Sequence, residues 1–496
     1  MLEQRLARAA EVTLPSPARP AWAEAVLERS AEAGRALDRI FWEQSCPGGW
    51  DMRARLQASG GAWSRTATAL MRFHAGPFDR FRGREPFLDV GPRPPGGGLW
   101  PPFATRGEIA GMVARHPELA EGILAPRTVV RERDGQPEVL PFAEAYAGWL
   151  ALAAGHLREA VSLARDDDTA DYLMRCADAI ETGGGCRLPP EAGGLAAVLG
   201  PYDPGEDRLL RRKAAYVAML GWIDPEETRR LDPFLAAREA LIRYLPDTLE
   251  LPEDVPPAVL VVADEFYRGG GAAHGLQPVA WTRRTAEGSY SVLWRDRIEA
   301  RREVILEPLS SLVLDVDQRP LLTPEGYFQL ILMRELGRGL VPPPEVAPGD
   351  PEVGAVLAEA RAGAVGRHSM EWFLRRGVLP ASLGREHHTA LLMELLATIR
   401  AGEDSVPGRA ALIALNWHRE QGGILHDPDT GRFRVVPDRM LDSETALAGA
   451  LLAAETSETG AEELLAAYGH AGSEVRGMLA RTADLPVAIR VPDGQR

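Results

Sequence analysis

The chain has 496 residues, of which 45% are hydrophobic and 26% charged, so it is long enough for two or three domains with a sizeable buried core. Its formal net charge of −15 argues against a nucleic-acid partner, because binding to a phosphate backbone requires a basic surface. No stretch reaches the ~18 apolar residues of a membrane span, and residues 1–15 lack the apolar core of a secretory signal. We therefore expect no membrane partner and a cytoplasmic location.

The chain has three cysteines, Cys46, Cys176 and Cys186, which form no C-x-x-C pair and leave an odd thiol. This pattern is typical of a reducing compartment, and it argues against a disulfide framework and against a cysteine-rich zinc site. The sequence predicts no cofactor and gives no indication of the oligomeric state.

The first part of the chain alternates helix-patterned stretches with loops rich in proline and glycine. Gly91–Pro102 (GPRPPGGGLWPP) would interrupt any helix or strand, so we predict a connection there. Pro141–Arg165 and Ala170–Ile180 have the alanine and leucine spacing of helices, and Asp166–Asp168 separates them.

The region Ala258–Trp294 has a different pattern. Val259–Asp264 (VLVVAD) is a short β-type run, Arg268–Gly275 (RGGGAAHG) is a glycine loop, and Ser289–Trp294 (SYSVLW) alternates like a strand. Together they predict a small β-subdomain within a mostly helical protein.

Beyond this region the pattern is helical again. Thr323–Glu325 supplies an N-cap, a first-turn proline and an acidic first turn for a helix that ends at Pro342–Pro344. A second helix is predicted to begin at the cap Asp350 and to stop at Gly377. Leu485–Val491 is predicted to be a terminal strand.

The segment Met333–Leu340 (MRELGRGL) has the form of a zinc-peptidase H-E-x-x-H helix in which arginine occupies both histidine positions. In the intact motif two imidazoles at i and i+4 bind zinc, and the glutamate acts as general base on the metal-bound water. Arg334 and Arg338 stay protonated and have no lone pair for a metal. The sequence therefore predicts no metal here and keeps Glu335 as the candidate catalytic base.

Two other groups are weaker metal candidates. The acidic run 166–171 contains D-D-x-x-D, a pattern that binds magnesium-diphosphate, but acidic turns between helices are common. His368, His387 and His388 fall in one helical region, where a solvated or hydrogen-bonded histidine is the more common case. Whether either group binds a metal stays open.

Several segments resemble, in order and spacing, the dipeptidyl peptidase III family of zinc metallopeptidases, in particular its short bacterial members. They are Gly200–Asp203 with Glu206, Asp207 and Lys213–Ala215, then Glu299–Pro308, Met333–Leu340, Ala358–Gly363, Gly408–Ala410 with Asn416 and Trp417, and Leu485–Arg490.

The resemblance implies a mainly helical, two-lobed α+β protein with a small β-barrel or β-sheet subdomain and a cleft between the lobes where peptides bind. We expect residues 1–207, 253–297 and 480–496 to form a lower lobe with the β-subdomain. Residues 208–252 and 298–479 are expected to form a helical upper lobe that carries the degenerate zinc motifs.

The resemblance also assigns residues of the zinc site. Glu359 corresponds to the family's third zinc ligand, while Ala358 and Gly363 stand where the family has acidic residues. The groups that would orient the histidines are therefore missing together with the histidines.

Three further departures concern substrate binding. Tyr202 and Asp203 match a G-P-Y-E motif that grips the substrate amino terminus, with a shorter carboxylate at position 203. Arg409 remains from an H-G-R segment whose transition-state histidine is Pro407 here, and Gly183–Gly194 replaces a strand that lines the substrate. We expect no peptidase activity of the family type.

Two guanidiniums carry the same charge as one zinc ion, so Arg334 and Arg338 would preserve the charge balance near Glu335 and Glu359. One interpretation is a structural salt-bridge network in an abandoned metal site. The other is an anion site, because a guanidinium fork suits bidentate binding of a carboxylate or phosphate.

Two function classes follow. We predict a metal-independent enzyme, repurposed from this scaffold, in which Glu335 performs acid/base chemistry on an anionic small-molecule or peptide-like substrate in the interlobe cleft. The expected binding residues are Arg334, Arg338, Glu359, Tyr202, Asp203 and Arg409. The alternative is a non-catalytic pseudopeptidase that binds a peptide or a partner protein.

Overall fold

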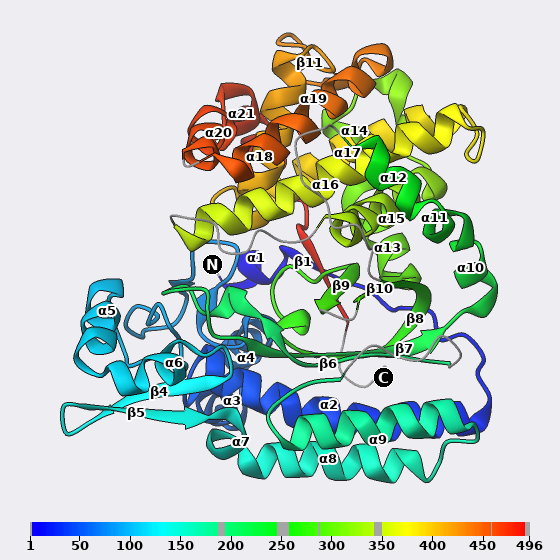
Figure 1. Ribbon diagram of the computed structural model, residues 1–496. Helices are drawn as coiled ribbons and strands as arrows, with labels where there is room; N and C mark the ends of the chain where they lie inside the picture. Colours follow the sequence, from blue (N-terminus) through cyan, green and yellow to red (C-terminus); the bar gives the residue numbers. More distant parts are fainter. Residues whose placement is uncertain are drawn as a thin grey trace.

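The computed structural model describes residues 2–186, 194–245, 257–285, 288–341, 350–457 and 459–491. In these ranges the protein is a mainly helical, two-lobed α+β structure, in which a five-stranded sheet lies between a lower layer of helices and an upper group of helices (Figure 1). The predicted fold class is confirmed. None of the helices in the described ranges is long and apolar enough to cross a bilayer.

The central sheet consists, in spatial order, of β6 (Leu195–Asp203), β7 (Ala215–Ile223), β8 (Ala258–Gly270), β10 (Gly288–Trp294) and β9 (Ala280–Thr285). Neighbouring strands are antiparallel except for β8 and β10, which are parallel. β6 and β7 are buried along nearly their whole length. Strands that are buried on both faces carry continuous apolar runs instead of alternating apolar and polar residues. For this reason the sequence pattern did not predict β6 and β7.

The strands predicted in the β-region are found as β8 and β10. The glycine loop predicted at Arg268–Gly275 is wrong in its first half, because β8 continues through Gly270 and pairs there with β7. Gly270 has a φ of 60°, a left-handed conformation that glycine adopts without strain, and the chain turns away from the sheet directly after it.

Three long helices cover the lower face of the sheet. α2 (Ala21–Ser45) packs along β7 and β8, α8 (Ala147–Val161) packs on α2, and α9 (Asp167–Glu181) packs on α8 and β6. The helix predicted over Pro141–Arg165 is present as the short α7 (Phe142–Ala145) followed by α8. Asp166 caps α9 by accepting a hydrogen bond from the backbone N–H of Thr169 at 2.7 Å, so the acidic run 166–171 is a helix start.

The upper lobe is built from α15 (Pro324–Leu340), α16 (Pro351–Arg375), α17 (Ser382–Ala401), α18 (Val406–Glu420) and α19 (Pro437–Thr456). Both predicted N-caps are confirmed, because the Thr323 and Asp350 side chains accept backbone N–H bonds from Gly326 and Glu352. The predicted stop at Gly377 is also confirmed, with α16 ending at Arg375. The stop predicted at Pro342–Pro344 lies outside the described residues.

Shorter elements complete the chain. They are α1 (Leu2–Leu6), β1 (Ala9–Glu11), α3 (Gly49–Ser59), α4 (Ala62–His74), β2 (Phe78–Asp79), β3 (Glu85–Pro86), α5 (Arg106–Arg115), η1 (Pro117–Leu119), α6 (Ala120–Leu124), β4 (Thr128–Arg133), β5 (Gln136–Pro141), η2 (Pro204–Glu206), α10 (Pro225–Arg229), α11 (Asp232–Ala236), α12 (Arg238–Tyr244), η3 (Gly271–Ala273), α13 (Arg295–Arg301), η4 (Arg302–Leu306), α14 (Glu307–Val313), η5 (Val316–Leu321), β11 (Ile424–His426), β12 (Phe433–Val435), α20 (Gly460–Tyr468), α21 (Ser473–Arg481) and β13 (Ala488–Arg490).

The predicted connection at Gly91–Pro102 and the terminal strand are both found, the latter as β13, which pairs in parallel with β1. The predicted division into lobes stays a prediction. One observation goes against its boundary at residue 208: β7 comes from the segment assigned to the upper lobe, yet it lies in the sheet between β6 and β8.

Candidate functional site

Helices α15 and α16 cross in contact at two glycines. A side-chain carbon on Gly337 would collide with the α16 backbone at Gly366, and one on Gly366 would collide with the α15 backbone at Met333. Only residues without a side chain allow the two backbones to approach so closely. The crossing brings Glu359 of α16 next to Arg338 of α15.

Four of the predicted site residues meet at this crossing, and we call them the α15–α16 quartet: Arg334, Glu335, Arg338 and Glu359. Arg334 Nε donates to Glu335 Oε1 at 2.9 Å, and Arg338 Nε lies 3.2 Å from Glu335 Oε2. Arg338 Nη2 donates to both oxygens of Glu359, at 2.8 and 2.7 Å. Each carboxylate oxygen of the quartet therefore has a guanidinium partner.

The quartet lies at the edge of the interior. The Glu335 side chain is 2% exposed, whereas Arg338 retains 29% and Glu359 26% of its accessible surface. Burial raises the pKa of Glu359, but Arg338 and Arg334 together outweigh burial and hold this pKa below its usual value. The charges thus stabilise one another across the two helices.

The side chains of the quartet do not fit a zinc ion. Protein zinc sites use lone pairs from imidazole, thiolate or carboxylate groups, and a guanidinium has no such lone pair. Both Glu359 oxygens accept from Arg338. Within the described ranges, no group of three or more His, Cys, Asp or Glu residues is arranged to hold a metal ion.

A cavity of about 720 Å³ lies beside β9, and we call it the β9 cavity; none of the quartet residues is in its described lining. Thr282 of β9 connects the two, because it lines the cavity and its hydroxyl donates to Glu335 Oε2 at 2.7 Å. The described lining contains three arginines, Arg127, Arg283 and Arg284, and no carboxylate. The cavity is therefore basic although the whole chain is acidic.

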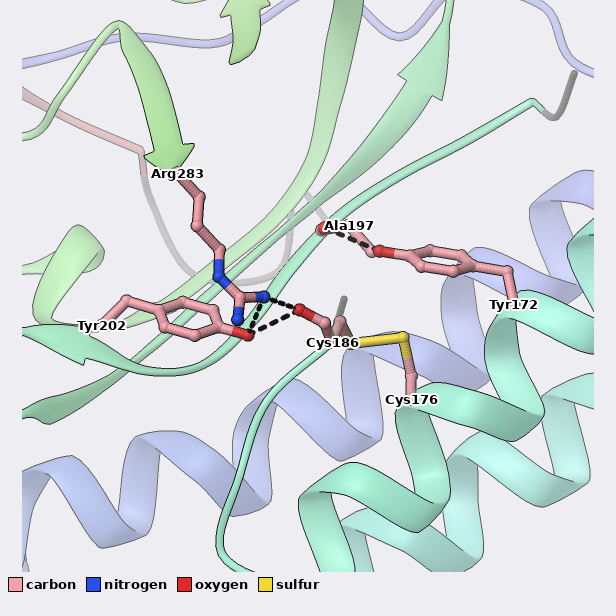
Figure 2. Close-up of a disulfide and its surroundings, with 6 residues drawn as sticks. All are labelled: Tyr172, Cys176, Cys186, Ala197, Tyr202 and Arg283. Atoms are coloured by element: carbon pink, nitrogen blue, oxygen red, sulfur yellow. Dashed lines mark hydrogen bonds between the residues drawn. A yellow bond between two sulfur atoms is a disulfide. The ribbon is translucent and has the colours of Figure 1, made fainter. Parts of the chain in front are cut away.

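Tyr202 and Arg283 form one wall of the β9 cavity and meet at the backbone carbonyl of Cys186 (Figure 2). The Tyr202 hydroxyl donates to that carbonyl at 2.7 Å, and Arg283 donates both to the carbonyl and to the Tyr202 oxygen. The Arg283 guanidinium also lies 4.2 Å from the centre of the Tyr202 ring. Burial raises the pKa of Tyr202 to about 12 despite Arg283, so the hydroxyl stays protonated and can donate.

Cys186 also forms a disulfide with Cys176 of α9, and the two Cα atoms lie 4.5 Å apart (Figure 2). The cysteine pattern argued against a disulfide framework, and this single disulfide was not predicted. The reason is tertiary: the turn after α9 brings two cysteines separated by 10 positions side by side, a contact that no local motif indicates. The disulfide anchors the carbonyl that Tyr202 and Arg283 share.

The other two predicted binding residues lie elsewhere. Asp203 accepts a hydrogen bond from the backbone N–H of Gly205 at 2.7 Å, and burial raises the pKa of its carboxyl. Arg409 of α18 lies 3.7 Å from Glu352 at the start of α16. Neither residue belongs to the described lining of the β9 cavity, and their role in ligand binding stays a prediction.

The sequence pattern did not predict β9 or the three polar side chains that it contributes to the cavity, Thr282, Arg283 and Arg284. The segment Ala280–Thr285 is rich in β-prone residues and stands directly before the strand that was found, so a hairpin pattern was present. Arg284 also binds the end of α15, where it donates to the backbone carbonyls of Arg338 and Val341. Such bonds satisfy carbonyl groups that a helix end leaves free.

His368, His387 and His388, which the sequence left as possible metal ligands, are buried in the upper lobe. His387 and His388 lie on α17, and His388 Nε2 is 3.5 Å from a carboxylate oxygen of Glu444. Burial lowers the pKa of His387 to about 3. His368 contacts the hydroxyl of Thr445 at 3.1 Å, and these residues form no metal-binding arrangement in the part of the chain that is described.

Two solved structures match nearly the whole chain. Dipeptidyl peptidase III from Caldithrix abyssi matches with a TM-score of 0.88 and 26% identity, covering 99% of each chain. Dipeptidyl peptidase III from Corallococcus sp. strain EGB matches with a TM-score of 0.91 and 26% identity, covering 99% of this chain and 96% of that chain. The fold is dipeptidyl peptidase III-like.

Comparison of sequences alone matches a smaller part of the chain. Nudix hydrolase 3 from Arabidopsis thaliana is 24% identical over 311 residues, which are 59% of this chain and 40% of that protein. The chain thus spans less than half the length of this relative. No family model matches the chain. The dipeptidyl peptidase III-like scaffold therefore rests on the structural matches.

Proposed function

We propose that this chain is a non-catalytic pseudopeptidase that binds a peptide-like or other anionic ligand in the β9 cavity. The resemblance to zinc peptidases assigns the two histidine ligands to positions 334 and 338, which carry arginine here. The observation that carries the proposal is that every oxygen of Glu335 and Glu359 has a guanidinium partner. Activation of a water molecule by Glu335 would require breaking an ion pair in a nearly buried site.

The lining of the β9 cavity supports an anionic ligand. Arg283 and Arg284 are bonded to backbone carbonyls, whereas the exposed Arg127 side chain has neither an ion pair nor a hydrogen bond within the described chain. A guanidinium with free N–H edges suits a carboxylate. A cavity of about 720 Å³ falls within the range of about 300–1,000 Å³ that is usual for small-ligand sites.

The test combines metal analysis, a peptidase assay and binding. We expect purified protein to contain no stoichiometric zinc and to release no dipeptides from peptide amino termini. Short peptides with a free carboxylate should bind, and Arg127→Gln should weaken this binding about tenfold. Arg133→Gln, which removes a 78% exposed arginine on β4, is the matched control and should leave binding unchanged. Bound zinc with dipeptide release would overturn the proposal.

The second candidate is the metal-independent enzyme predicted from the sequence. The hydrogen bond from Thr282 to Glu335 supports it, because this bond connects the retained glutamate to the β9 cavity. Incubation of wild type and Glu335→Gln with a mixture of metabolites, followed by mass spectrometry, separates the candidates. Turnover by wild type that is lost in Glu335→Gln supports the enzyme, whereas binding without turnover in both supports the pseudopeptidase.

The proposal keeps the cytoplasmic location predicted from the sequence. In a reducing compartment the disulfide between Cys176 and Cys186 would be largely reduced. Thiol trapping in intact cells measures this directly: a fully oxidised pair would contradict the cytoplasmic location and leave the ligand proposal unaffected.

A further inference from the structure

A second cavity, of about 980 Å³, has no residue of the quartet in its described lining. It is lined by residues of α2, α3, α4, α8, β8, α13 and β13, of which α2, α3 and α8 lie below the sheet in Figure 1. It shares no lining residue with the β9 cavity. Eight arginines and three carboxylates line it, so it is strongly basic within a chain of net charge −15. We call it the arginine cavity.

The three carboxylates of the arginine cavity are already engaged. Glu265 pairs with Arg268 and Arg297, at 2.5 and 2.6 Å. Glu32 pairs with an arginine one helical turn along α2. Asp38 accepts the backbone N–H of Gly270 at 2.8 Å and lies 3.1 Å from the ring of His274. None of the three carboxylates forms an ion pair with Arg39 or Arg53 in the described structure.

Arg39 and Arg53 line the cavity and lie against tryptophan rings. The guanidinium of neither has an ion pair or hydrogen bond across the described ranges, and Arg53 Nε is buried without a hydrogen-bond partner. Each guanidinium carbon lies 3.9 Å from the centre of the Trp50 ring, and Arg39 is also 4.7 Å from Trp149. Stacking of this kind fixes the plane of the guanidinium and leaves its N–H edges free for an anion.

Nearby carboxylates compensate the charges of Arg39 and Arg53 only in part. Burial lowers the pKa of both side chains, because a partly desolvated cation without a partner is unfavourable. Glu43, Asp51 and Asp38 act on Arg39 only from beyond ion-pair distance. An anion within reach of the accessible N–H groups of the two guanidiniums, beside the Trp50 ring against which both lie, would reduce this cost.

We propose that the arginine cavity binds a small organic phosphate through Arg39 and Arg53. Two pre-oriented guanidiniums match the several oxygens and the double charge of a phosphate group. The remaining volume, within the range of about 300–1,000 Å³ for small-ligand sites, leaves room for the organic part of the ligand. The site is independent of the function proposed for the β9 cavity.

The experiment titrates the full-length protein with AMP, inorganic pyrophosphate and citrate, using calorimetry and the fluorescence of the tryptophans that line the cavity. We expect saturable binding of AMP and pyrophosphate and about tenfold weaker binding of citrate, which carries carboxylates only. Arg39→Gln and Arg53→Gln should each weaken phosphate binding about tenfold or more. Arg133→Gln, the exposed control on β4, should bind like wild type.

Several outcomes would overturn this proposal. They are the absence of saturable phosphate binding, unchanged binding in Arg39→Gln and Arg53→Gln, equal losses in Arg133→Gln, and citrate binding as tight as that of the phosphates. If a glutamine variant does not fold, Arg53→Lys keeps the charge but loses the planar fork. Its shift in melting temperature on adding pyrophosphate should be smaller than that of wild type, and an equal shift would contradict the proposal.

Discussion

The α15–α16 quartet and the arginine cavity use the same side chain in opposite ways. In the quartet each arginine lies against a carboxylate, and Arg338 binds both Glu335 and Glu359. In the arginine cavity Arg39 and Arg53 lie against a tryptophan ring and have no carboxylate partner among the described residues. A balanced cluster is complete by itself, whereas an unbalanced one gains by binding an anion. The difference predicts which arginines support the fold and which support ligand binding.

The largest effect is expected from Arg338→Gln. This change leaves Glu359 without its guanidinium and Glu335 with only Arg334. Removing one partner of a largely buried ion pair leaves an uncompensated charge, so the free energy of unfolding should fall by about 3 kcal/mol. Chemical denaturation measures the loss, and Arg338→Lys, which keeps the charge without the fork, should lose less. A loss near zero would show that the quartet does not support the fold.

A second prediction uses pH to separate the two regions. The pKa of Glu359 is lowered in the folded protein, so its stabilising effect is present above the unfolded value near 4.3 and is lost as the pH falls through the lower folded value. At pH 7, Glu359→Gln should be less stable than wild type by about 2 kcal/mol. The difference in the free energy of unfolding between wild type and Glu359→Gln should disappear in acid, below about pH 4. A gap independent of pH would mean that the loss is one of packing.

The two regions also differ in what their sequence could reveal. The caps Thr323 and Asp350 predicted both helices of the quartet correctly, because capping is a local property. The position of Glu359 beside Arg338 followed from resemblance alone, since it depends on the close glycine crossing of two helices. No local sequence pattern predicted the arginine cavity, because its arginines come from several helices and two strands that meet only in the folded chain.

The strands of the β-sheet were also only partly predictable from local sequence. β8 and β10 were predicted from apolar and alternating runs, but β6 and β7 are buried on both faces and so lack alternation. The disulfide between Cys176 and Cys186 was missed for a related reason, since the turn that joins the two residues is set by the packing of α9 on β6. Local chemistry was predictable, and contacts made by tertiary packing were not.

A smaller effect is expected at the contact between the quartet and the β9 cavity. Thr282→Val removes the hydroxyl that donates to Glu335 but keeps the shape of the side chain. The hydrogen bonds of this hydroxyl with Glu335 and with the buried Ser291 hydroxyl are both lost, so the free energy of unfolding should fall by about 1.5 kcal/mol. Thr282→Ser keeps the hydroxyl and is the matched control. Unchanged stability of Thr282→Val would show that these hydrogen bonds do not stabilise the fold.

The smallest effect on stability is expected from Arg53→Gln, and this prediction most directly tests the comparison. No carboxylate loses its partner in this variant, because Arg53 has none in the described structure. The stacking energy that is lost opposes the desolvation cost that is removed, so the free energy of unfolding without ligand should change by about 0.5 kcal/mol or less.

The same variant should differ strongly from wild type once an anion is present. Pyrophosphate at ten times its dissociation constant stabilises a protein that binds it by about 1.4 kcal/mol, and Arg53→Gln should lose most of this gain. Denaturation curves of both proteins with and without pyrophosphate give all four values. A large loss for Arg53→Gln without any anion would mean that Arg53 is a structural residue like Arg338. In that case the contrast between the two regions would fail.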